Sequence, residues 1–146
     1  MTATEARTTL LAQHEHLRRR LDACAGLAWQ QRTGESTPSE LDEALAQLRD
    51  EFADHNQIET TMIVDLLHGP AAWCWQLIDR MLEEHVAEHA AFWRLLSGTP
   101  AEVAKHIDEL ADELDAHLSA EERTFLNPMT LRDDLIRRRP CELATG

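Results

Sequence analysis

The stretch RMLEEHVAEHAAF, residues 80–92, places His85 and His89 four positions apart, on one face of a predicted helix. The apolar stripe of that helix comprises Ile78, Met81, Phe92 and Leu96, and the two histidines interrupt it. An uncompensated polar side chain is costly in an apolar core. The pair therefore predicts that something inside the core bonds to the imidazole nitrogens.

A similar pair recurs on two further predicted helices, and a third carries a single histidine on its apolar stripe. His55 and Glu59 are four positions apart, His117 and Glu121 are spaced in the same way, and His14 stands alone. All five residues fall on the apolar stripe of their helix, at a similar depth in an antiparallel arrangement. Five imidazoles and two carboxylates directed into one core can offset their burial cost by binding metal.

The donor types narrow the choice of metal. Imidazole and carboxylate without thiolate suit iron, manganese or zinc. Seven ligands are too many for one tetrahedral zinc, whereas two metals that share the carboxylates use all of them. We therefore predict a pair of iron ions, with the histidines divided three and two. The metal with fewer histidines would keep an open position for an external ligand.

Helix-start signals divide the chain. Thr37-Pro38-Ser39-Glu40 and Thr99-Pro100-Ala101-Glu102 each offer an N-cap threonine, a proline at the first position and a glutamate at the third. Gly69-Pro70 breaks the chain between them, and Thr2 with Glu5 is a further candidate cap. The predicted helices are 3–32, 38–67, 71–97 and 100–126. The predicted fold is all-α, an up-down-up-down antiparallel four-helix bundle over 1–128, with a short C-terminal helix or tail over 129–146.

Composition limits the partners. The chain has 146 residues and a formal charge of −13, which argues against nucleic acid and anionic membranes. We expect a cytoplasmic protein, because there is no signal peptide pattern or membrane-spanning stretch. The three cysteines are odd in number and have no C-x-x-C spacing, so a disulfide framework is not expected and a reducing compartment fits.

Several nearby polar and apolar residues are expected to have roles other than metal ligation. His16, His68 and His106 lie off the stripes and are expected to be surface or structural residues. Glu122 is the alternative to Glu121, although helical register favours Glu121. Glu88 is expected to be mostly solvated. Trp93 is expected to face an apolar pocket next to the site, whose other candidate residues are Phe52, Met62, Met81, Phe92, Leu114 and Leu118.

The order His, His-x-x-x-Glu, His-x-x-x-His, His-x-x-x-Glu resembles hemerythrin-like proteins, the HHE cation-binding family. Local phrases match as well: LLAQHEHLRRRLD, RMLEEHVAEHAAF and AHLSAEERTFLNP. The likeness covers residues from about 8 to 128. It implies two irons held by the seven residues, with Glu59 and Glu121 bridging and an oxo or hydroxo bridge completing the centre.

One motif departs from the oxygen-carrying hemerythrins. They have Asp five positions after the histidine of the fourth helix, whereas this chain has Glu at four and five, Glu121 and Glu122. This looks like the bacterial branch and weakens the transfer of reversible oxygen carriage.

We therefore expect a di-iron protein whose ligand is dioxygen, nitric oxide or hydrogen peroxide. The alternatives are a catalase-like or nitric-oxide-detoxifying enzyme, a sensing module, and iron storage or delivery. An electron donor is a candidate partner, and the chain would act as a monomer or small homo-oligomer.

Overall fold

The computed structural model describes residues 2–67, 75–124 and 126–127, and the side chains of these residues except 66, 67 and 75–81. All regular secondary structure in these ranges is helical. The helices are α1 (Ala3–Arg32), α2 (Pro38–Leu67), α3 (Trp75–Leu96), α4 (Pro100–Lys105) and α5 (Ile107–Arg123). Of the helices described, none is long and apolar enough to cross a membrane.

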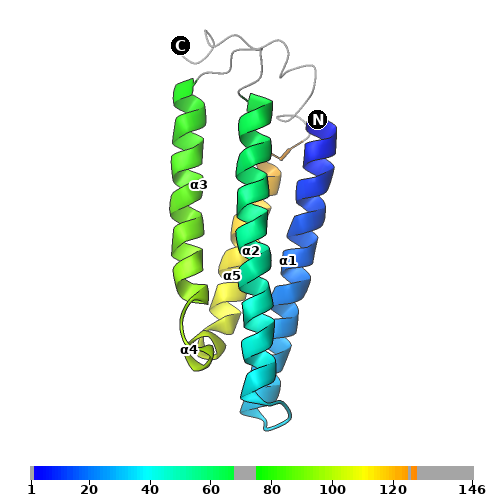
Figure 1. The fold of residues 1–146 in the computed structure, drawn as a ribbon, viewed down its shortest axis with the longest axis vertical. Coiled ribbons are helices and arrows are strands. Elements are labelled where there is room, and N and C mark those ends of the chain that lie inside the picture. The colour runs from blue at the N-terminus through cyan, green and yellow to red at the C-terminus, as the bar shows by residue number, and fades with distance from the viewer. Residues whose placement is uncertain (1, 68–74, 125, 128–146) are drawn as a thin grey trace.

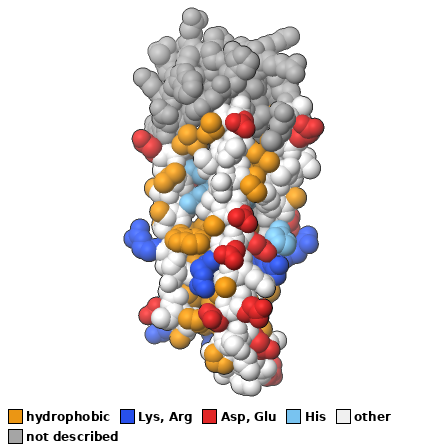
Figure 2. Space-filling model, viewed as in Figure 1, with side chains coloured by type: hydrophobic (Ala, Val, Ile, Leu, Met, Phe, Trp, Pro, Cys, Tyr) orange, Lys and Arg blue, Asp and Glu red, His pale blue; other side chains and the backbone are white. Residues whose placement is uncertain are grey.

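Four of these helices lie side by side in an elongated molecule, and the short α4 lies at one end (Figure 1). In the view of Figure 1, α1 and α3 run downwards, and α2 and α5 run upwards. Helices α1 and α2 pack together along much of their length, whereas α3 and α5 pack only sparsely against each other. Figure 2 shows acidic side chains spread over one face among basic and apolar ones, so the negative charge does not form a single patch there.

Helix starts follow the predicted capping signals. Thr2 with Glu5 and Thr99 with Glu102 each form a complete capping box, in which the threonine oxygen and the glutamate carboxylate both accept backbone N–H groups. At the start of α2 only one of the two hydrogen bonds of the capping box forms. The Glu40 carboxylate accepts the backbone N–H of Thr37 at 3.0 Å, while the Thr37 hydroxyl lies 3.1 Å from the Ser39 hydroxyl.

The first two helices have the predicted bounds. The described part of the third starts at residue 75, and the predicted segment 71–74 and the tail 129–146 lie outside the described residues. The prediction of one continuous fourth helix over 100–126 is wrong. His106 leaves helical geometry at φ −117° and ψ 17°, and its N–H bonds to the carbonyl of Val103, three residues back, at 3.1 Å. This break redirects the chain while Val103 and Ile107 both stay in the core.

Two apolar clusters form the core. The larger one takes side chains from α1, α2, α3, α4 and α5, and includes Leu17, Phe52 and Leu114. A smaller one near the start of α1 contains Ala3, Ala6, Leu10 and Leu126. On α1, His14 lies between Leu10 of the smaller cluster and Leu17 of the larger. The predicted site therefore lies between two apolar layers along the bundle.

The cap at Thr99 gives a test of this local chemistry. Replacing Thr99 with Ala removes the oxygen that accepts the Glu102 N–H at 3.3 Å, so the free energy of unfolding should fall by about 1 kcal/mol. Thr99→Ser keeps the hydroxyl and should retain most of that stability. Urea unfolding followed by circular dichroism measures both, and equal stability of the two variants would contradict the capping role.

Candidate metal centre

Seven buried or partly buried side chains form two adjoining groups with metal-ligand chemistry. The three-histidine group consists of His85, His89, His117 and Glu121, and the two-histidine group consists of His14, His55 and Glu59. Within each group, one candidate donor atom per residue lies within 4.8 Å of the others. The structure therefore brings together all seven residues singled out from the sequence, and these buried groups can bind metal ions.

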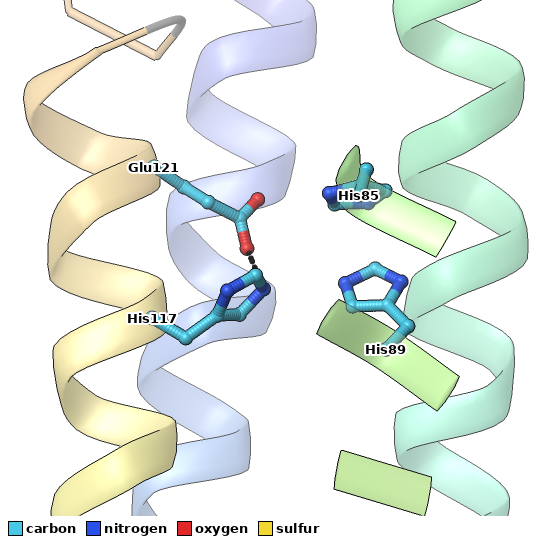
Figure 3. A group of neighbouring side chains, drawn as sticks. All are labelled: His85, His89, His117 and Glu121. Atoms are coloured by element: carbon cyan, nitrogen blue, oxygen red, sulfur yellow. Dashed lines mark ion pairs between the residues drawn. The ribbon is translucent and has the colours of Figure 1, made fainter. Parts of the chain in front are cut away.

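The three-histidine group joins α3 and α5. Figure 3 shows His85 and His89 on α3 pointing across to His117 and Glu121 on α5. The ring centroids of His85 and His89 are 3.7 Å apart, and those of His89 and His117 are 5.2 Å apart. His117 also forms an ion pair with Glu121 one turn along the same helix. Four donors from two helices thus converge on one small volume.

Glu59 connects the two groups. Its Oε2 lies 3.3 Å from His14 Nε2 and 3.2 Å from His55 Nε2. Its Oε1 contacts His85 Nε2 and lies 4.0 Å from His89 Nε2. Each oxygen of this one carboxylate therefore faces a different group, which is the placement that a carboxylate bridging two cations requires.

Several donor atoms at the centre lack hydrogen bonds. Among the described residues, Nε2 of His89 and Oε2 of Glu121 have no hydrogen-bond partner. The nearest partners of His55 Nε2 and Glu121 Oε1 are Glu59 and His117, inside the centre itself. His55, His89 and Glu121 expose only 2%, 8% and 4% of their surface. Buried polar groups are nearly always satisfied. A cation between these atoms would satisfy them, so the residues present fit a bound metal.

The outward nitrogens of the two-histidine group are held by polar partners. His14 Nδ1 donates to the Glu122 carboxylate at 2.9 Å, and His55 Nδ1 donates to the Gln13 side-chain oxygen at 2.8 Å. Arg18 in turn donates to Glu122 at 2.8 Å. A proton on Nδ1 leaves the lone pair on the inward Nε2, which is the form that binds metal.

His117 has the same arrangement. Its Nδ1 lies 2.9 Å from the Glu88 carboxylate, although 61% of the Glu88 side chain is exposed. Glu88 is thus mostly solvated, as expected, but it also contacts a candidate ligand, which was not expected. Glu122 lies outside the centre, where it accepts from His14 Nδ1, whereas Glu121 belongs to the three-histidine group. The roles of Gln13, Glu88 and Glu122 as partners of outward histidine nitrogens were not predicted from the sequence. Each is next to a candidate ligand in the sequence, and this was the only signal for them.

The charges within the centre are strongly coupled. Burial raises the pKa of Glu121 to about 7, and the negative charge of Glu59 adds to the rise. Burial also disfavours the charged form of Glu59. Nevertheless, hydrogen bonds from His14, His55 and His85 hold the pKa of Glu59 far below its usual range. The two carboxylates thus differ in acidity, because Glu59 is held ionised whereas Glu121 keeps a proton more readily than an ordinary glutamate.

The histidines of the centre also differ from one another in pKa. Burial and the charge of His85 lower the pKa of His89 to about 3, so His89 is neutral and ready to bind a cation. Burial alone would lower the pKa of His14 and His117. Hydrogen bonds to carboxylates outweigh it and raise both values.

A cleft of about 690 Å³ between α3 and α5 reaches the centre. Its lining includes His85, His117, Glu121 and Phe92. The Phe52 ring lies 5.5 Å from that of His89, centroid to centroid, as expected for an apolar neighbour of the site. The expectation for Trp93 is wrong, because this side chain lies on the surface with 40% of its area exposed.

No protein-family model, curated protein or solved structure matches the chain. The resemblance to hemerythrin-like proteins therefore depends on the residues and spacing quoted above. The geometry of the seven side chains is independent of that resemblance.

The pKa shifts predict how cation binding depends on pH. Glu121, His14 and His117 must lose their protons to bind a cation, and all three pKa values are raised. Protons compete more strongly as the pH falls through these values, so affinity for Co²⁺ should fall between about pH 8 and pH 6, with proton release on binding. Chelator competition at each pH measures the affinity, and circular dichroism checks that the fold persists. An affinity independent of pH would contradict the prediction.

Proposed function

We propose that the chain is a non-haem di-iron protein of the hemerythrin-like type, folded as an up-down-up-down antiparallel four-helix bundle, that binds or reacts with a small oxidant. The observation that carries the proposal is the position of Glu59. One carboxylate lies between two groups of imidazoles, with one oxygen toward each. A single cation would not need donors on both sides of this carboxylate.

The division of the ligands supports two cations of unequal coordination. The three-histidine group offers three imidazoles and Glu121, whereas the two-histidine group offers two imidazoles and Glu59. Glu59 and Glu121 lie close enough for the charge of one to raise the pKa of the other. Both can therefore be shared between two cations, which leaves the two-histidine side short of one protein ligand.

The donor set favours iron. Imidazole and carboxylate ligands suit iron, and an acidic, thiolate-free centre is less suited to soft metals. Cys24 is buried in the larger apolar cluster, where burial raises the pKa of its thiol to about 11. In the described part of the chain, no cysteine belongs to either group.

The protein residues would then have distinct tasks. His85, His89 and His117 would hold one iron, and His14 and His55 the other. The apolar layers at the two ends of the centre would limit the approach of water from those directions. When bound, the iron pair would supply electrons and an open coordination position for dioxygen, nitric oxide or hydrogen peroxide.

Turnover of peroxide or nitric oxide is the second candidate function. The cleft between α3 and α5 favours it, because it connects the surface with His85, His117 and Glu121. Simple storage of iron has no comparable observation in its favour.

Iron content and the absorption spectrum test the proposal. Protein purified with iron should hold two irons per chain. Its ferric absorption bands should bleach with dithionite and return in air. Peroxide consumption by the same sample distinguishes turnover from binding alone. One zinc, or no metal after loading with ferrous iron, would contradict the proposal.

Ligand variants provide the matched controls. His55→Ala and His117→Ala should each lose iron and lower the free energy of unfolding of the loaded protein, because metal binding is coupled to folding. His16→Ala removes a histidine whose side chain is 54% exposed and pairs with Glu51 at 3.1 Å, so it should keep both irons. Unchanged iron content in His55→Ala and His117→Ala would refute the ligand assignment.

A further inference from the structure

The walls of the cleft between α3 and α5 differ in charge from the other surfaces around the centre. Glu84, Glu88 and Glu113 line it, and all three are exposed. Among the described residues that line this cleft, none is a lysine or arginine. A narrow space with walls of one charge sign concentrates ions of the opposite sign. The cleft is therefore attractive to cations.

The floor of the cleft consists of the centre itself. His85, His117 and Glu121 line it, and Glu121 is 4% exposed. Its Oε1 pairs with His117, whereas its Oε2 makes no hydrogen bond among the described residues. A cation that moves down the cleft would thus meet a buried acceptor that is otherwise unsatisfied. Figure 3 shows the side chains of this floor facing the space between α3 and α5.

The other approaches are less favourable. Between α1 and α5, the Arg18 guanidinium pairs with Glu15, Asp115 and Glu122, so these carboxylates are already engaged by a cationic side chain. Between α1 and α2 there is a smaller pocket of about 170 Å³ over His55. Its Glu51 is already paired with Arg20 at 2.9 Å.

We propose that the cleft between α3 and α5 is the entry route for the metal cation, with Glu84, Glu88 and Glu113 attracting it to the three-histidine group. This inference rests on the proposed metal centre and adds the path by which that centre is filled. The lining of this cleft already runs from exposed carboxylates to His85 and Glu121, so the path does not require the helices to separate. Glu88 also contacts His117, so changing it would disturb a candidate ligand as well as the charge of the cleft.

The rate of iron uptake tests the route. Metal-free protein is mixed with Fe²⁺ under anaerobic conditions at low ionic strength, and binding is followed by stopped-flow fluorescence. The double variant Glu84→Gln/Glu113→Gln should bind at least about three-fold more slowly than the wild type, and the difference should shrink at high salt. Its final iron content should be unchanged.

The matched control has the same change in charge elsewhere. Asp42→Asn/Glu43→Gln alters two exposed carboxylates near the start of α2 and should bind iron at nearly the wild-type rate.

Two variants that enlarge a side chain give a second test of the route. Ala116→Leu, which narrows the cleft, should slow both uptake and release, whereas Ala23→Leu on the exposed side of α1 should not.

The outcomes separate the two proposals. Wild-type uptake with rates that are equal in cleft variants and controls would overturn the route alone. Wild-type protein that takes up no iron would overturn the proposed function and the route with it.

Discussion

The carboxylate of Glu59 is buried among imidazoles from three helices, and the rest of the centre is arranged around it. His14 from α1, His55 from α2 and His85 from α3 all approach its two oxygens. A buried carboxylate without partners would cost several kcal/mol. The helices must therefore keep their rotation and relative height, because a shift of one residue on any of them would withdraw a partner from this carboxylate.

This constraint explains the distribution of apolar residues. The larger cluster holds the helices together on one side of the centre, and Leu10 with its neighbours covers the other side. Outside the centre, Gln13, Glu88 and Glu122 hold the outward nitrogens of three histidines. The inward nitrogens are thereby oriented before any cation arrives. Binding then requires loss of protons rather than rearrangement of helices.

Much of this arrangement could be predicted from the sequence, because the signals were local. Capping threonines and prolines placed the bounds of α1 and α2, and the spacing of four placed each pair of donors on one face. The choice of Glu121 over Glu122 followed from helical register alone.

The missed features depend on contacts between helices. The break at His106 lies within a favourable helical sequence and reflects how α4 and α5 meet the core. The partnership of Glu88 with His117 joins α3 to α5, and that of Gln13 with His55 joins α1 to α2. The exposure of Trp93 depends on how α3 is rotated against its neighbours. None of these can be read from the spacing of residues within one helix.

The position of bound metal tests the central claim most directly. Crystals of the iron-loaded protein, measured at the iron absorption edge, would locate each iron by anomalous scattering. We expect two peaks, one within His85, His89, His117 and Glu121 and the other beside His14 and His55, with Glu59 between them. A single peak, or peaks away from these seven side chains, would contradict the account.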